Sequence, residues 1–298
     1  MAVRVLAITL VSVLLGASCL SAQTTLTSTW KEGDRFSYEI EESFSSFPFT
    51  YPKFKTPTAY SQSLKLDTNW HVKTVGLDGN AVINVEIERV RFKLDQKGIP
   101  LPIEHLDLDT KNPVEAQNQV ELTTFSAVSG FVGSRIEITI NDKREVSKVE
   151  FSEPLAAHFE LNQIMRELAS VFGPAFRKEG MRRRIAGWLI ASPSTPVSNG
   201  DTWSQEDASL PEDSIVYIDS YTLREPILRE GKAITEIEVE SAVKQLGRKE
   251  STAEEIKGEG VVHIDERTGR IIDATLRQPF SGTVNLTITA KLLLKPDQ

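Results

Sequence analysis

The side chains that could catalyse a reaction or bind a metal are few in this sequence, and they are scattered. The four histidines match no metal-binding spacing such as HExxH; they are His71, His105, His158 and His263. The stretch "HLDLDT" would place His105, Asp107 and Asp109 on one face of a strand, where they could bind a divalent cation. A solvated strand or turn explains the same alternation. The sequence has no GxSxG elbow and no phosphate-binding loop, so we predict no enzyme activity, no metal and no cofactor.

A basic cluster follows in "FRKEGMRRR", which places five cationic side chains close together in an acidic chain. We single out Arg182, Arg183 and Arg184 as candidates for contact with anionic lipid headgroups or an acidic partner. The alternative is the solvated end of a helix.

An aromatic stretch, "FSSFPFTYPKFKTPTAY", interleaves six aromatic residues with three prolines. Because prolines are unfavourable in a central strand, we expect an extended loop here. Phe47, Phe49 and Tyr51 alternate, so an extended backbone would direct all three to one side, with Phe54 close behind. These four residues are our candidates for the edge of an apolar groove or a docking surface. The alternative is a loop whose aromatic rings only cover the sheet.

The first residues have the order of a secretory signal peptide: a positive charge at Arg4, an apolar run over 5–16, and small residues before Ala22. We predict cleavage after Ala22 and export to the periplasm or beyond. Lipid modification of Cys19 is the alternative, although Gly16 occupies the position where a lipobox has Leu. No later segment is as long as a membrane span.

Charge and cysteine content exclude several classes of function. The formal net charge is −8, and loss of Arg4 with the leader makes the mature chain one unit more negative, so binding to nucleic acid is not expected. Cys19 is the only cysteine, and it leaves with the leader. The mature chain therefore has no disulfide, no thiol nucleophile and no cysteine metal cluster.

Period-2 alternation dominates the rest of the chain and indicates strands with one polar face. Phe36, Tyr38, Ile40 and Phe44 alternate with polar residues, and residues 284–294 repeat the pattern. In "AVINVEIERVRFKL" the apolar phase changes by one residue near Glu88 and Arg89, which predicts a β-bulge. Helical spacing is strongest over 153–190 and weaker over 113–126. We therefore predict a mainly β (α+β) fold of curved antiparallel sheets with packing helices.

The order of features indicates an internal repeat. Gly33-Asp34 and Gly200-Asp201 each precede a large aromatic residue, Phe36 and Trp203, and similar turns and strands follow in both halves. We predict two half-barrel-like modules, over 23–190 and 200–298, joined by a linker over 191–199, with both aromatic residues buried at equivalent positions. The alternative is that Gly-Asp marks ordinary turns.

The stretches "STPVSNGDTWSQ", "REGKAITEIEVESAV" and "GEGVVHIDERTGRIIDATL" resemble an uncharacterised family of exported bacterial proteins with a domain of unknown function. The resemblance covers nearly the whole mature chain. It implies a twice-repeated curved antiparallel sheet, similar in outline to LolA/LolB-type lipoprotein carriers, whose half-open barrels hold acyl chains. It implies no catalytic residues.

We therefore expect an exported, non-enzymatic binding or carrier-like protein with an apolar groove in a curved sheet, and a lipid or other apolar molecule as its ligand. The alternative is an envelope module that docks on a protein or membrane surface.

Overall fold

The computed structural model describes residues 26, 30–49, 58–97, 105–113, 118–153, 155, 178–210, 215–245, 257–280 and 286–296. The predicted leader over 1–22, with Cys19, lies outside the described residues, as do Tyr51 and Phe54. For Phe47 and Phe49 only the backbone is described.

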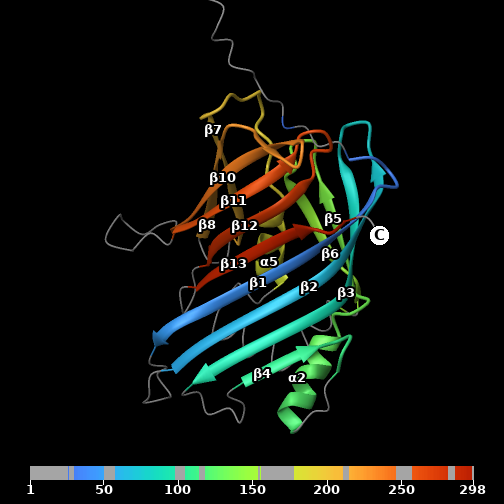
Figure 1. Cartoon of the computed structure of the whole chain (residues 1–298), viewed down its shortest axis with the longest axis vertical. Helices are drawn as coiled ribbons and strands as arrows, with labels where there is room; N and C mark the ends of the chain where they lie inside the picture. The colour runs from blue at the N-terminus through green and yellow to red at the C-terminus, as the bar shows by residue number, and fades with distance from the viewer. Residues whose placement is uncertain are drawn as a thin grey trace, which may run out of the picture.

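The described residues form one antiparallel sheet of 13 strands (Figure 1). The strands are β1 (Arg35–Phe49), β2 (Thr58–Val75), β3 (Ala81–Lys97), β4 (His105–Asp109), β5 (Arg135–Ile140), β6 (Val146–Phe151), β7 (Thr202–Leu210), β8 (Ile215–Leu223), β9 (Ile227–Arg229), β10 (Lys232–Gln245), β11 (Lys257–Asp265), β12 (Ile271–Phe280) and β13 (Leu286–Leu294). The described helices are α2 (Gln119–Ser129) and α5 (Lys178–Trp188). The prediction of a mainly β, antiparallel fold is confirmed.

The strand order is β6-β5-β3-β2-β1-β13-β12-β11-β10-β8-β7, with β4 added to β3 and β9 added to β10. Strands from the first half of the chain thus occupy one side of the sheet and those from the second half the other. The last strand, β13, lies between the halves and pairs with both β1 and β12. The two halves share one continuous sheet, and their division into two modules stays a prediction.

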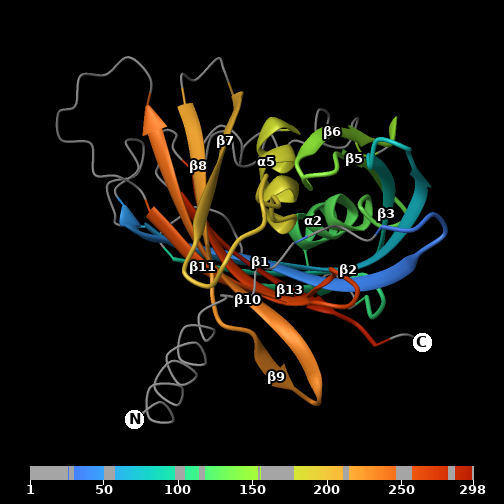
Figure 2. The same cartoon turned by 90° about the horizontal axis from the view of Figure 1, so that it is seen from above.

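The sheet is bent into a trough (Figure 2). Strands β7 and β8 form one wall and β3, β5 and β6 the other, while α5 and α2 lie between them. The β5–β6 turn also contacts the second half of the sheet, because the side chain of Arg144 in this turn donates a hydrogen bond to the carbonyl of Gly269 in the β11–β12 turn.

A β-bulge contributes to this curvature, because an extra residue in one strand bends that strand and increases its twist. Asp67 is opposite Arg89 while Thr68 is opposite Ile87, so Glu88 is the extra residue in β3. The bulge predicted near Glu88 and Arg89 is confirmed. It keeps the apolar side chains on the inner face both before and after the slip.

The core occupies the concave side of the trough. Every second residue of β1 from Phe36 to Ile40 is buried, and Trp70 of β2 packs against Phe36 with ring centroids 5.8 Å apart. The convex side instead carries ion pairs between neighbouring strands. Asp67 Oδ1, for example, lies 2.8 Å from Arg91 Nη2 and 3.0 Å from Lys295 Nζ.

The aromatic stretch begins inside a strand, in contrast to the predicted loop. Strand β1 continues to Phe49, which pairs with Thr58, and the register between β1 and β2 shifts after Ser46. The irregularity accommodates Pro48, which has no N–H for a ladder hydrogen bond. Both expected helical regions contain helix where they are described, in α2 and α5. Among the described residues, no helix is both long and apolar enough to span a membrane.

Candidate functional site

Helix α5 lies against the β8 wall of the trough through a buried ion pair. The Arg183 side chain is 2% exposed and donates two hydrogen bonds of 2.6 Å to the carboxylate of Asp219 in β8. Ser241 of β10 donates a third, also of 2.6 Å, and the Arg183 guanidinium lies 5.1 Å from the centre of the Tyr217 ring. Burial acts to lower the pKa of Arg183, but the charge and hydrogen bonds of Asp219 outweigh it and raise that pKa.

The next residue makes a second buried pair with the sheet. Arg184 Nε donates a 3.0 Å hydrogen bond to Glu42 Oε1 of β1, and both side chains are almost fully buried. The structure therefore corrects the expectation that Arg183 and Arg184 face an anionic surface, because their charges are satisfied by acids inside the trough. Arg182 is half-buried, and its contact with a partner stays a prediction.

A close approach between helix and sheet positions the end of α5. A side chain at Gly187 would have its Cβ 1.5 Å from Nε2 of Gln278 in β12, so the absence of a Cβ lets these two elements come together. This contact brings Trp188, Leu189 and Ile190 down onto the concave face, where all three are buried.

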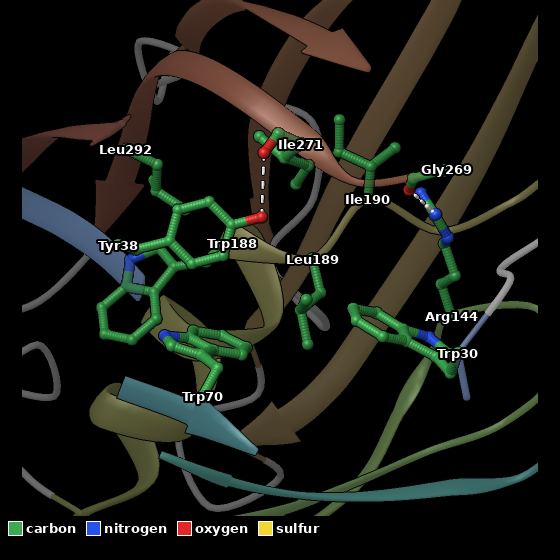
Figure 3. Close-up of a pocket in the computed structure, with 10 residues that line it drawn as sticks. All are labelled: Trp30, Tyr38, Trp70, Arg144, Trp188, Leu189, Ile190, Gly269, Ile271 and Leu292. Atoms are coloured by element: carbon green, nitrogen blue, oxygen red, sulfur yellow. Dashed lines mark hydrogen bonds between the residues drawn. The ribbon is translucent and has the colours of Figure 1, made fainter. Parts of the chain in front are cut away.

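These three residues roof an aromatic pocket (Figure 3). Its other lining residues are Trp30, Tyr38, Trp70, Arg144, Gly269, Ile271 and Leu292. The pocket has a volume of about 10 Å³, which is the space of roughly one water molecule. The Tyr38 hydroxyl donates to the carbonyl of Ile271 at 2.8 Å, and Trp70 Nε1 donates to Thr68 Oγ1 at 3.0 Å. Burial raises the pKa of Tyr38, so its hydroxyl remains a neutral donor.

Arg144 gives one end of this pocket a positive charge. Its side chain is buried, and its backbone has a φ of 64°, in the left-handed region. One guanidinium nitrogen donates to the Gly269 carbonyl, while Nε has no hydrogen-bond partner among the described residues. Burial lowers the pKa of Arg144 to about 10, and the group therefore remains charged at neutral pH.

No pattern in the sequence predicts this pocket. The pocket is built from four separate segments, which supply Trp30, Trp70, Arg144 and Trp188, so no local spacing in the sequence predicts it.

The aromatic candidates named from the sequence are Phe47, Phe49, Tyr51 and Phe54. Phe47 and Phe49 lie at the far end of β1, the strand that also supplies Tyr38, and their role at a groove stays a prediction together with that of Tyr51 and Phe54.

The acidic alternation in β4 forms ion pairs with the neighbouring strand. Asp107 lies 2.8 Å from Lys93, and His105 Nδ1 lies 2.6 Å from Asp95. Asp109 accepts hydrogen bonds from Arg89. Within the described ranges, no three or more His, Cys, Asp or Glu residues are grouped so as to hold a metal ion.

A larger groove of about 620 Å³ lies on the convex side, over β1, β2 and β3. Its lining includes Ser37, Asn69 and Glu88, and these residues hydrogen-bond to one another. Ser37 Oγ donates to Asn69 Oδ1 at 2.6 Å, and Asn69 Nδ2 donates to Glu88 Oε1 at 2.5 Å. The groove surface is therefore polar, and these three side chains already hydrogen-bond to one another, unlike the donors of the concave pocket that have no partner among the described residues.

Comparison with known proteins identifies no relative by sequence. No family model matches the chain, and no curated protein matches it. Among solved structures, lipovitellin, described for its lipid–protein interactions, is similar over 89% of this chain at 10% identity and a TM-score of 0.30. The chain spans only 25% of the length of lipovitellin.

Two bacterial structures are similar along their whole length. One is a protein from Bacteroides fragilis with a YmcC-like fold, described as exported, at 9% identity, 92% coverage of this chain, 100% coverage of that chain and a TM-score of 0.22. The other is a β-barrel-like protein of a domain of unknown function from Brucella abortus, at 10% identity, 93% and 100% coverage and a TM-score of 0.22. The structural neighbours of this chain thus include uncharacterised β-barrel-like proteins, and scores this low establish no shared function.

Proposed function

We propose that the protein is an exported, non-enzymatic binding or carrier-like protein that takes an apolar ligand into the trough of its sheet. The observation that supports this best is the aromatic pocket between the concave face and the end of α5. Tyr38 and Trp70 form its walls and Trp188 is part of its roof, with aliphatic side chains around them. Ligand sites in proteins are typically concave and apolar, with a few polar groups that fix orientation.

The pocket must widen to hold a ligand, and the attachment of α5 limits where that change can occur. Arg183 and Arg184 join the helix to the sheet through buried ion pairs. Such pairs fix one position for the helix but add little net stability, because desolvation offsets their attraction. Separating them would leave buried charges without partners, which is strongly unfavourable, so we expect the pocket to widen at the roof residues Trp188, Leu189 and Ile190 while Arg183 and Arg184 keep their partners.

The wider context of this function is also proposed. We take 23–190 and 200–298 to be two modules joined by 191–199, and the rim of the trough to include Phe47, Phe49, Tyr51 and Phe54. Export follows from the predicted leader over 1–22. Intact-mass analysis of the secreted protein should give Gln23 as the first residue, and a retained Met1 or an acylated Cys19 would contradict this.

Binding can be tested with N-phenyl-1-naphthylamine, a neutral apolar fluorophore. The wild-type protein should bind it saturably, with energy transfer from tryptophan. Leu292→Phe should weaken binding by filling the pocket, whereas Leu292→Ala should not weaken it. The matched control is Leu293→Phe, because Leu293 is the next residue of β13, does not line the pocket and is 52% exposed.

The result would contradict the proposal if the fluorophore did not bind saturably, or if Leu292→Phe and Leu293→Phe had equal effects. Circular dichroism of each variant would show that the sheet is retained.

Docking on an envelope protein or membrane surface stays a second candidate function, and two exposed leucines are the residues with which to test it. Leu77, in the β2–β3 turn, and Leu228, in β9, are fully or largely exposed. Exposed apolar residues mark a contact site when they are grouped, so this function requires that both leucines contact the same surface. Vesicle flotation of wild type and of Leu77→Ser with Leu228→Ser tests this function, which requires that the double substitution abolish co-flotation.

A further inference from the structure

We infer that the aromatic pocket binds the carboxylate of a long-chain amphipathic ligand at Arg144. This inference rests on the proposed function, and it defines the class of ligand. Its starting point is the distribution of hydrogen-bond donors and acceptors around the pocket.

The described residues leave the pocket with donors in excess. Arg144 Nε, Trp30 Nε1 and Trp188 Nε1 are buried, and none of the three has an acceptor among the described residues. Two carbonyl oxygens that line the same space are already used, because Gly269 accepts from Arg144 and Ile271 accepts from the Tyr38 hydroxyl. Buried donors without acceptors are costly, and a ligand group that supplies only acceptors would satisfy Arg144 and Trp30, which lie together at one end of the pocket (Figure 3).

The charge of Arg144 also favours a ligand group that only accepts hydrogen bonds. In the described part of the chain, no carboxylate is paired with Arg144, whereas Arg183 pairs with Asp219 and Arg270 pairs with Asp34 at 2.7 Å. An unpaired buried cation is strongly unfavourable unless something compensates it. A carboxylate is the natural partner, since its two oxygens accept charge-assisted hydrogen bonds from a guanidinium.

The rest of the pocket selects an apolar tail. Arg144 and Trp30 lie at one end, and Tyr38, Trp70 and Trp188 lie toward the other (Figure 3). The pocket is therefore amphipathic along its length, with a cation at one end and aromatic rings at the other. A long-chain carboxylic acid has this same distribution of charge and apolar surface.

The roof of the pocket, which must move to admit a ligand, is hydrogen-bonded to the turn that carries Arg144. Leu189 and Ile190 form part of the roof, and two residues later the amide of Ser192 donates to the carbonyl of Lys143 at 2.7 Å. The roof is thus attached to the turn that carries Arg144. Displacement of the roof by a tail and access of a head group to the guanidinium are expected to occur together.

The test compares two probes with the same tail, 11-(dansylamino)undecanoic acid, whose head group is charged, and its methyl ester, whose head group is neutral. Fluorescence titration of the wild-type protein should give a Kd for the acid about tenfold or more below that for the ester, as expected for a hydrogen bond to a charged group. Arg144→Met should remove this difference by weakening acid binding alone. Arg144→Lys, which keeps the charge, should retain part of it.

Arg270→Met is the matched control. Arg270 lies in the β11–β12 turn beside Gly269, but its charge is already paired with Asp34. This variant should keep the preference for the acid. Arg144→Met should melt no lower than the wild type without ligand, because it removes an uncompensated buried charge. Should it fail to fold, Arg144→Lys and Arg270→Met still decide the question: equal acid preference in Arg144→Lys, Arg270→Met and wild type would overturn the inference.

The outcomes separate this inference from the proposed function. Binding of neither probe would overturn both. Equal binding of acid and ester would overturn the assignment to Arg144 and leave the apolar site intact. If sodium chloride or sodium acetate raised the melting temperature of wild type but not of Arg144→Met, while acid and ester bound equally, the pocket would hold a free anion, and the inference would be wrong.

Discussion

Gly33 and Gly200 open β1 and β7 with the same backbone geometry. Each has a φ of 86°. The amide of Gly33 donates to the carbonyl of Val72 at 2.9 Å, and that of Gly200 donates to the carbonyl of Leu223 at 2.8 Å. The following aspartates match as well, since the Asp34 and Asp201 carbonyls accept from the amides of those same partner residues. The two Gly-Asp turns are therefore the same structural unit at two places in the sheet.

Replacement of either glycine by alanine should destabilise the protein by a similar amount. A Cβ at Gly33 or Gly200 would meet no atom within 4 Å, so the cost is that of the left-handed backbone alone, about 1–2 kcal/mol. Asparagine tolerates this region and should cost less. Urea denaturation of each variant measures the change, and an unchanged midpoint for both alanine variants would contradict it.

The aromatic residues after these turns are related but not equally buried. Phe36 stacks on Trp70, and Trp203 stacks on Tyr221 with ring centroids 5.4 Å apart. Trp203 is only half-buried, and its Nε1 donates to the Ala191 carbonyl at 2.8 Å. The expectation that it would be buried like Phe36 is thus wrong in extent, because β7 is the last strand of the sheet.

Trp203→Ala should consequently cost less than Trp70→Ala. We expect about 3–5 kcal/mol for Trp70, which is 1% exposed, and roughly half as much for Trp203 on the same scale. Trp203→Phe, which keeps the stack but removes the indole N–H, should fall between wild type and Trp203→Ala. Thermal or chemical unfolding gives the order, and a larger loss for Trp203 than for Trp70 would contradict it.

The sequence predicted the strands well because their inner and outer faces alternate. The phase change near Glu88 located the bulge, since a slip of one residue would otherwise turn the apolar side chains outward. Pairing between distant strands has no such local signal. The periodicity of β13 does not predict that this strand pairs with both β1 and β12. This pairing joins the two halves of the chain into a single sheet.

The burial of Arg184 could have been predicted from the position of Glu42 in the sequence. Glu42 follows Phe36, Tyr38 and Ile40 in the same phase of β1, so it had to lie on the concave face. A buried acid needs a cationic partner, and Arg184 supplies it. The aromatic pocket offered no comparable clue, because segments far apart in the chain build it.

The Arg183–Asp219 pair predicts strong non-additivity. Arg183→Met leaves the Asp219 carboxylate buried with the Ser241 hydroxyl as its one side-chain donor among the described residues, and breaking such a pair should cost about 3–5 kcal/mol. Asp219→Asn alone should destabilise the protein by a similar amount, because it leaves the buried Arg183 guanidinium without a carboxylate partner. The double variant should lose less than the sum of the two, by about 0.5–3 kcal/mol. Urea denaturation of all four proteins completes the cycle, and strict additivity would show that the pair is not coupled.

The last prediction concerns acid stability and Asp109. The Arg89 hydrogen bonds hold the pKa of Asp109 well below its usual value, and the Lys111 amide and Asn112 side chain add to the effect. A depressed pKa in the folded state contributes stability that is present above the unfolded-state pKa of about 3.9. This contribution is lost as the pH falls from there toward the folded-state pKa.

Asp109→Asn should therefore lower the urea midpoint at pH 7, and its deficit relative to wild type should shrink progressively between about pH 4.5 and pH 2.5. Asp107→Asn is the matched control on the same strand. Asp107 pairs with Lys93, but the two side chains are 49% and 59% exposed, and exposed pairs contribute little because solvent screens them. A deficit in Asp109→Asn that stayed constant across this pH range would mean that the carboxylate acts through packing and not through its charge.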